Sequence, residues 1–362
     1  MTTKERMMCV YRNCLPDKIP VAAYGGFFSR NYYEKEAWNM GFGTVESYPL
    51  LSSLGVPMRI LPGYVPKIKG AEFSIKYVWD NGKLIERNTI ETPVGCVYQE
   101  NEQAMGAGSR HVRKYYVTKP EDYKIIQYIM ENTVYVSNEP QIKNRIAQIG
   151  EEGILYGRID RTPYQKLLVE VAGAEQFLVD LYTEPEIVEE LIQVMSHRMI
   201  EYFSLVAESS VDAFWSPENI TADLTPPENF KKYCVPFYRE FNKIAKQTGK
   251  PYVIHMDGHI KPLKEFISAE SFDVIESFSY PSMGGDMTFD EAHNAFDNMV
   301  ILPNFPSNIC LQTDEEIKGY LDEMIGKTRG KIPFMFFFSE DLPADQYSRI
   351  FPLVSEYVAR NG

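Results

Sequence analysis

The sequence lacks the cysteine patterns on which disulfide-rich and thiolate-bound metalloproteins depend. Its five cysteines are odd in number and scattered through 362 residues, and no two of them form a CxxC pair. This spacing gives neither a disulfide framework nor a zinc cage made of thiolates. We therefore expect a reduced, cytoplasmic protein that relies on its core, for which a hydrophobic content of 44% is ample.

Basic residues and long apolar runs are also scarce. The 37 lysines and arginines are outnumbered by 50 acids, so the formal net charge is −13. Nucleic-acid binding draws its affinity from clustered Lys and Arg. No run approaches the ~18 apolar residues that a membrane span requires, and the N-terminus carries no apolar signal segment. The sequence thus predicts no nucleic-acid partner and no membrane association.

Short apolar runs alternate with helical patterns from about residue 150 onward. Six such runs cover residues 153–159, 212–215, 252–255, 273–276, 299–302 and 334–338. Apolar runs that alternate with helices are typical of buried parallel strands. An open doubly wound sheet is the alternative, but the first strand, which closes on Gly25-Gly26, is not followed by a glycine-rich phosphate loop. We predict an α/β protein with a (βα)8 TIM-type barrel.

One stretch near the N-terminus departs from this rhythm. Residues 73–79 and 84–90 alternate between apolar and polar side chains on either side of Asp80-Asn81-Gly82, a strong turn signal. This pattern predicts a β-hairpin insertion. We expect one barrel domain over residues 1–362, with an N-terminal elaboration at about 62–110.

Acidic residues gather around one histidine where the later strands are predicted to end. In a βα barrel the carboxyl ends of the strands carry the chemistry. His255 and Asp257 lie two residues apart and so point to the same side of their strand. Glu276 and Glu340 stand at the ends of two later strands. These acids would repel one another without a cation, and no Lys or Arg occupies the strand tips from Trp215 onward.

A divalent metal is the simplest interpretation of this cluster, and nitrogen with carboxylate ligands suits zinc. We predict as metal ligands His255, Asp257, Glu276 and Glu340, the first three of them also catalytic. Two roles are open for Asp257. It either binds the metal itself or hydrogen-bonds His255 without touching the metal. Glu276 and Glu340 have structural alternatives too, as the partner of a basic residue and as a helix cap.

Further residues near the same strand ends are candidates for substrate binding. We predict this role for Glu218, Asn219, Tyr24, Phe27, Trp215 and Asn304. The aromatic members would suit a flat phenyl ring, with plain core packing as the alternative.

Several motifs, taken in order along the chain, resemble the uroporphyrinogen decarboxylase superfamily. They are Pro16-Asp-Lys-Ile-Pro20, Thr92-Pro-Val-Gly95 and His255-Met-Asp-Gly258, together with residues 4–7, 163–165, 226–233 and 304–317. The resemblance covers most of the chain and implies a barrel fold. Decarboxylases of this superfamily resemble one another in an arginine-rich turn near the N-terminus. The matching segment, residues 20–30, has a single arginine, which disfavours that branch.

The other branch, to which the chain is more similar, contains the corrinoid-dependent methyltransferases. Its members bind zinc through a His-x-Cys motif, a later Cys and a Glu. His255 and Glu276 match this pattern, whereas Asp257 stands at the first Cys and Ser339 or Glu340 near the second. The resemblance therefore implies a zinc enzyme with a harder metal centre.

Such a centre favours an oxygen-bearing substrate over a thiol. The resemblance implies methyl transfer between a small methylated substrate, such as an aryl methyl ether, and a corrinoid carried by a partner protein. The direction of transfer stays open. Two alternatives remain: a cofactor-free decarboxylase, which would need no corrinoid protein, and a non-catalytic barrel, which would bind its ligand without turnover.

Overall fold

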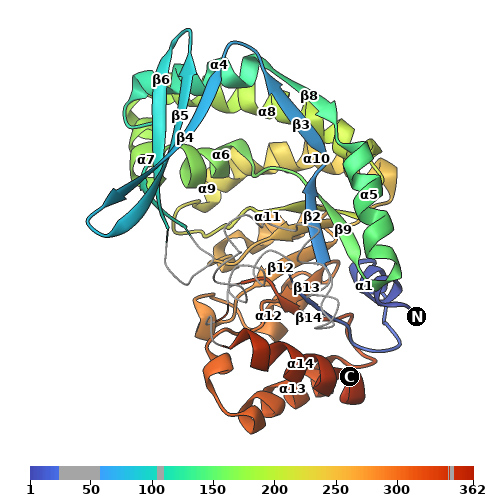
Figure 1. Cartoon of the computed structure of the whole chain (residues 1–362). Coiled ribbons are helices and arrows are strands. Elements are labelled where there is room, and N and C mark those ends of the chain that lie inside the picture. The colour runs from blue at the N-terminus through green and yellow to red at the C-terminus, as the bar shows by residue number, and fades with distance from the viewer. Residues whose placement is uncertain (24–57, 104–109, 341, 343–345) are drawn as a thin grey trace.

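The structure of the chain is a computed structural model, described for residues 1–23, 58–103, 110–340, 342 and 346–362 (Figure 1). Two of the residues predicted to bind substrate, Tyr24 and Phe27, lie outside these described residues, as does most of the segment 20–30. Among the described helices, none combines the length and the apolar character that a bilayer span needs.

Eight strands that run parallel to their neighbours form the centre of the molecule. They are β1 (Val21–Ala23), β2 (Met58–Pro62), β9 (Ile154–Arg158), β10 (Ala213–Ser216), β11 (Tyr252–His255), β12 (Val274–Phe278), β13 (Val300–Pro303) and β14 (Phe336–Phe338). The six strands from β2 to β13 form one sheet in sequence order, and β14 pairs with β1. A bridge between Asn304 and Phe337 joins β13 to β14.

This order confirms an α/β protein with a parallel sheet, and each of the six predicted apolar runs overlaps a strand. It is also the strand order of an eight-stranded barrel. Closure would require β1 to pair with β2, and no such pair forms within the described part of the chain. The closed barrel therefore stays a prediction.

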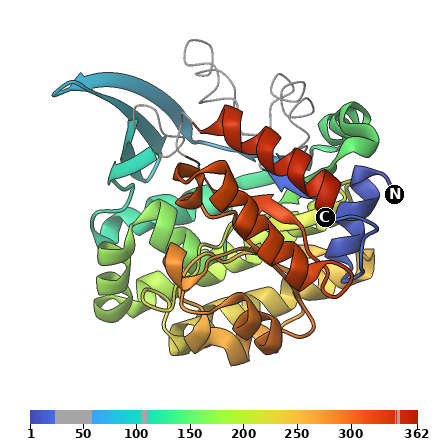
Figure 2. The ribbon, with the colours of Figure 1, turned by 90° about the horizontal axis from the view of Figure 1, so that it is seen from below.

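Helices surround the sheet (Figures 1 and 2). They are α1 (Thr3–Tyr11), α4 (Tyr123–Glu131), α5 (Glu139–Ile149), α6 (Pro163–Lys166), α7 (Ala174–Thr183), α8 (Pro185–Glu208), α9 (Pro227–Asn229), α10 (Val235–Thr248), α11 (Lys264–Ser268), α12 (Phe289–Ala295), α13 (Asp314–Thr328) and α14 (Tyr347–Asn361). Side chains at the helix termini determine where several of these helices begin or end. Thr2 and Glu5 form a capping box at the start of α1, and Thr313 and Glu316 form another at the start of α13. Gly249 ends α10 in the left-handed conformation.

Alternation along the strands divides the core into two layers. One set of strand residues packs beneath the helices, for example Ile254 and Ile275. The alternate set faces the interior, for example Val253 and Val274, and there it meets buried side chains of α1 such as Tyr11. Because side chains alternate with a period of two, the next inward positions on β11 and β12 are His255 and Glu276. The fold therefore aims the predicted site residues at the interior.

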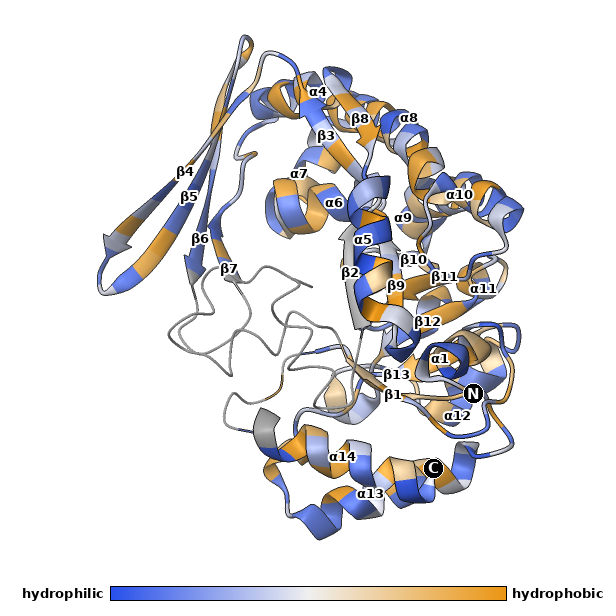
Figure 3. Ribbon diagram, turned by 45° about the vertical axis from the view of Figure 1, so that its right-hand side comes forward, coloured by the Kyte–Doolittle hydropathy of each residue, from blue (hydrophilic) through white to orange (hydrophobic). Residues whose placement is uncertain are grey.

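The N-terminal elaboration is larger than the predicted hairpin. Four antiparallel strands form a second sheet: β4 (Glu72–Asp80), β5 (Lys83–Thr92), β6 (Gly95–Gln103) and β7 (Arg110–Lys114) (Figures 1 and 3). This sheet packs against α4, where Ile90 and Val97 meet Ile125. Asn81 and Gly82 form the turn between β4 and β5 with φ of 50° and 78°, as a type I′ turn requires. The hairpin prediction is thus confirmed. A further antiparallel pair joins β3 (Tyr64–Ile68) to β8 (Thr133–Ser137).

Candidate metal centre

His255 lies at the centre of the candidate site, at the carboxyl end of β11. Its side chain is 7% exposed, and its Nε2 atom lies 3.6 Å from Asp257 Oδ2 and 3.4 Å from Glu340 Oε1. One donor atom from each of these three residues lies within 4.8 Å of the others. The structure therefore brings together three of the four predicted metal ligands.

Glu276, the fourth predicted ligand, lies on the opposite side of the imidazole ring. Its Oε2 atom is 3.0 Å from His255 Nδ1 and also accepts a hydrogen bond of 3.0 Å from the indole Nε1 of Trp215. A carboxylate only accepts, so His255 carries a proton on Nδ1 and presents Nε2 to Asp257 and Glu340. The arrangement differs from the predicted four-ligand set, because Glu276 occupies the position of an orienting carboxylate.

Asp257 is held by a chain of two donors, Asn219 and Arg161, of which only Asn219 was among the predicted site residues. Asn219 donates from Nδ2 to Asp257 Oδ2 at 2.8 Å, and it accepts at Oδ1 from Arg161 Nη1 at 2.6 Å. Arg161 also pairs with Glu170 at 3.0 Å. Arg161 lies just after the carboxyl end of β9. The same search of strand ends, extended to the strands that precede Trp215, would have identified it. Asn219, predicted to bind substrate, therefore contacts a predicted ligand, and its substrate role stays a prediction.

Glu340 is held by residues from two neighbouring strands. Ser277 of β12 donates from Oγ to Glu340 Oε1 at 2.8 Å, and Ser339 Oγ lies 2.9 Å from Ser277 Oγ. Asn304, predicted to bind substrate, accepts at Oδ1 from the backbone N–H groups of Ser339 and Glu340, each at 3.2 Å. Asn304 thus fixes the backbone that carries Glu340. The family resemblance had placed Ser339 near the position of the second Cys, whereas nothing in that resemblance pointed to Ser277.

The charges of the cluster shift the pKa values of its members. Burial disfavours the imidazolium, but the Glu276 carboxylate and the hydrogen bonds to Asp257, Glu276 and Glu340 raise the pKa of His255 well above its ordinary value. Burial likewise opposes ionisation of Asp257, yet His255 and Asn219 lower the pKa of that carboxyl group. The site thus favours positive charge on its central nitrogen and negative charge around it.

The spacing of the three donor atoms suits a divalent metal. Atoms that bind one zinc tetrahedrally at about 2.0–2.1 Å lie about 3.3 Å from one another. The Nε2 distances of 3.6 and 3.4 Å are close to this value. One nitrogen and two carboxylate oxygens are ligands that zinc accepts, and three protein ligands leave a fourth position open. The residues that are present therefore fit zinc.

Glu218, another predicted substrate contact, is turned away into the core. It is fully buried, and it accepts hydrogen bonds from Thr162 N at 2.7 Å, Thr162 Oγ1 at 3.1 Å and Ser216 Oγ at 2.9 Å. Burial raises the pKa of Glu218 to about 7, although these donors oppose the shift. Trp215, also predicted to contact substrate, is 6% exposed and engaged with Glu276.

The raised pKa of Glu218 predicts a pH dependence of stability. The folded state holds a proton that the unfolded chain releases near pH 4.5, so the free energy of unfolding should fall as pH rises from about 4.5 to about 7. The shift corresponds to roughly 3 kcal/mol. In the Glu218→Gln variant, we expect the free energy of unfolding, measured by urea titration at pH 5 and at pH 8, to lose this decrease with pH. Glu315→Gln, whose side chain is 83% exposed, should keep it; an unchanged slope in Glu218→Gln would contradict the prediction.

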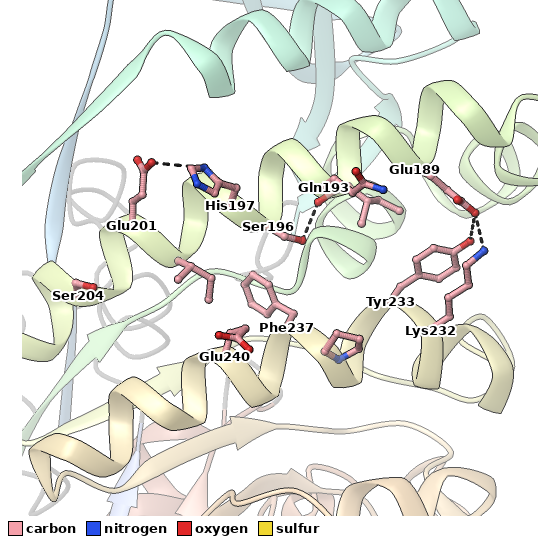
Figure 4. A pocket seen from close by; sticks show the side chains of 13 residues that line it. Glu189, Gln193, Ser196, His197, Glu201, Ser204, Lys232, Tyr233, Phe237 and Glu240 are labelled. Carbon is pink, nitrogen blue, oxygen red and sulfur yellow. Dashed lines mark hydrogen bonds and ion pairs between the residues drawn. The ribbon is translucent and has the colours of Figure 1, made fainter.

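A groove on the outside of the molecule has no part in this site. It measures about 630 Å³ and lies between α8 and α10, with Ile192 and Phe237 among its lining residues (Figure 4). None of the predicted site residues lines it. The groove therefore belongs to the outer helical layer.

Known proteins resemble this chain in family and in fold. The model of the family described as uroporphyrinogen decarboxylase (URO-D) matches residues 166–345, which include every residue of the metal cluster. A solved methyltransferase from Methanosarcina mazei matches with a TM-score of 0.59 at 14% sequence identity, covering 100% of this chain and 98% of that one. At this identity the likeness concerns the fold. No curated protein matches the sequence. Residues 166–345, about half of the chain, therefore resemble the uroporphyrinogen decarboxylase family.

Proposed function

We propose that the protein is a zinc-dependent methyltransferase that moves a methyl group between a small methylated substrate and a corrinoid carried by a partner protein. The observation that carries this proposal is the orientation of His255. Glu276 holds its Nδ1 atom, so that Nε2 faces Asp257 and Glu340 at 3.6 and 3.4 Å. The fold likeness to the Methanosarcina mazei methyltransferase supports the reaction class. A closed (βα)8 barrel is part of the same proposal.

The oxygen-rich ligand set supports an oxygen-bearing substrate. No cysteine belongs to the cluster, in the part of the chain that the structure describes. Carboxylates give a harder and more electrophilic metal centre than thiolates. When bound, zinc would supply a Lewis acid that stabilises negative charge on the oxygen that loses its methyl group. An aryl methyl ether is therefore the substrate class that we propose, with Tyr24 and Phe27 as contacts of its ring.

The protein residues prepare this chemistry by orientation and charge. Glu276 keeps the proton of His255 on Nδ1. Asp257 and Glu340 contribute the two negative charges that would balance a divalent cation. Their side chains are 27% and 40% exposed, whereas that of His255 is 7% exposed. The cluster is thus open on the carboxylate side, where substrate and the corrinoid would approach.

A defined assay tests the proposal. Purified protein should contain about one zinc per chain, as one ligand cluster requires. With anisole as methyl donor and free cob(I)alamin as acceptor, absorbance should record the formation of methylcobalamin. A chelator that strips the zinc should stop the reaction, and added zinc should restore it. Methyl transfer that continues at full rate in the zinc-stripped protein would contradict the proposal, as would a zinc-loaded protein that demethylates neither anisole nor its ring-substituted methyl ethers.

A further inference from the structure

Backbone conformation distinguishes two residues at the metal centre. Four non-glycine residues among those described have a positive φ: Asn13, Asn81, Asn219 and Ser277. Asn13 directly follows the C-cap residue of α1, and Asn81 lies in the turn between β4 and β5. Both are places where this conformation is common. Asn219 and Ser277, with φ of 52° and 59°, lie instead beside the candidate ligands.

Ser277 is the less expected of the two. Residues other than glycine, asparagine and aspartate seldom adopt the left-handed conformation. Ser277 does so inside β12, where the pairing with β13 shifts register between Glu276 and Phe278. Such bulges re-aim side chains next to functional sites. The bulge lets Glu276 face the interior while the next residue also reaches the site.

Each of these two residues donates a hydrogen bond to a different carboxylate of the cluster. Asn219 Nδ2 donates to Asp257 Oδ2, and Ser277 Oγ donates to Glu340 Oε1, both at 2.8 Å. The direction of the first bond is fixed, because Arg161 only donates and therefore holds the amide oxygen of Asn219. The direction of the second bond is fixed as well, because the Glu340 carboxylate only accepts and Ser277 Oγ is therefore the donor. The strained backbone thus aims one donor at each carboxylate.

We propose that Asn219 and Ser277 are positioning residues that hold Asp257 and Glu340 in the geometry for metal binding, at the expense of a strained backbone. This inference rests on the proposed metal centre. It gives Asn219, for which the sequence predicts substrate binding, a role toward Asp257. It also assigns a role to Ser277, for which the sequence carried no signal.

Glycine substitutions separate the hydrogen bond that each residue donates from the backbone strain that each residue imposes. Asn219→Gly and Ser277→Gly remove the donor but accept a positive φ without strain. We expect the affinity for zinc, measured by competition with a chromophoric chelator, to fall about 10- to 100-fold. The Tm of the zinc-free protein should stay unchanged or rise by about 1–3 °C. Asn219→Asp, which keeps the shape but offers a second carboxylate to Asp257, should lose affinity as well.

A matched control is available at Asn13, whose φ of 56° is nearly the same. Asn13→Gly should relieve the same strain and bind zinc as tightly as the unchanged protein. If Asn219→Gly and Ser277→Gly also keep full zinc affinity, the positioning role is wrong, even where methyl transfer and zinc binding by the unchanged protein uphold the proposed function. If the unchanged protein binds no zinc, the metal centre and this inference fail together.

Discussion

The His255→Ala variant is expected to purify without zinc and to lose methyl transfer to the limit of detection. His255 supplies the one nitrogen of the cluster, and its Nε2 atom is the point on which Asp257 and Glu340 converge. Without it, two carboxylates face each other with no cation between them. A mixed ligand set would become a pair of like charges, which binds zinc weakly under competition from solvent. Zinc content and methylcobalamin formation measure the outcome.

Loss of the imidazole also removes one of the partners of a buried carboxylate, Glu276, which keeps its hydrogen bond from Trp215. Glu276 is fully buried, and breaking a buried pair by removing one member costs about 3–5 kcal/mol. The variant should therefore be checked by circular dichroism before its activity is interpreted. His197→Ala is the matched control, because that histidine lies on α8 with 78% of its side chain exposed. A folded His255→Ala protein that keeps its zinc would show that the metal binds elsewhere.

Glu276→Gln should weaken zinc binding without abolishing it. The amide keeps the size of the carboxylate and one acceptor oxygen, but it removes the negative charge that stabilises the proton on His255 Nδ1. Loss of an orienting carboxylate of this kind lowers metal affinity about 10- to 100-fold. A competition titration at fixed pH measures the change, with zinc content at saturation as the second readout.

This variant also decides between two roles for Glu276. If Glu276 were itself a ligand, as the sequence predicts, its amide variant should lose zinc almost as completely as His255→Ala. An orienting role predicts full zinc occupancy at saturating metal. Glu270→Gln is the control, because Glu270 is a buried acid paired with Arg239 away from the site. Zinc affinity equal to that of the unchanged protein would contradict both roles.

The sequence predicts those parts of the fold and site that depend on period and local chemistry. The two-residue spacing predicts that His255 and Asp257 point to one side, and the structure, in which β11 ends at His255, has both in one cluster. The turn at Asn81-Gly82 likewise predicts the hairpin that the structure contains. These inferences succeed because a two-residue period and a turn type require no knowledge of distant segments.

The orientations of Glu218 and Glu276 depend on contacts between distant segments, which the pattern of residues along a strand does not predict. Glu218 looks like a loop residue at a strand tip, but donors from Thr162, 56 residues earlier, draw it into the core. Glu276 faces Nδ1 of His255 instead of the metal side because β11 and β12 pair with His255 opposite Glu276. The register of two strands decides that role, and one sequence does not reveal the register.

The pairing of β1 with β14 has a consequence for the order in which the protein assembles. Val21 pairs with Phe336, so the first and last strands of the sheet meet only when nearly the whole chain has been made. Contacts this distant in sequence slow folding, because the chain must close a long loop before they form. Glu340 follows β14 by two residues and arrives with it. A nascent chain that already carries His255 and Asp257 therefore lacks the third residue of the candidate cluster, and the proposed metal would be captured only after synthesis of the last strand.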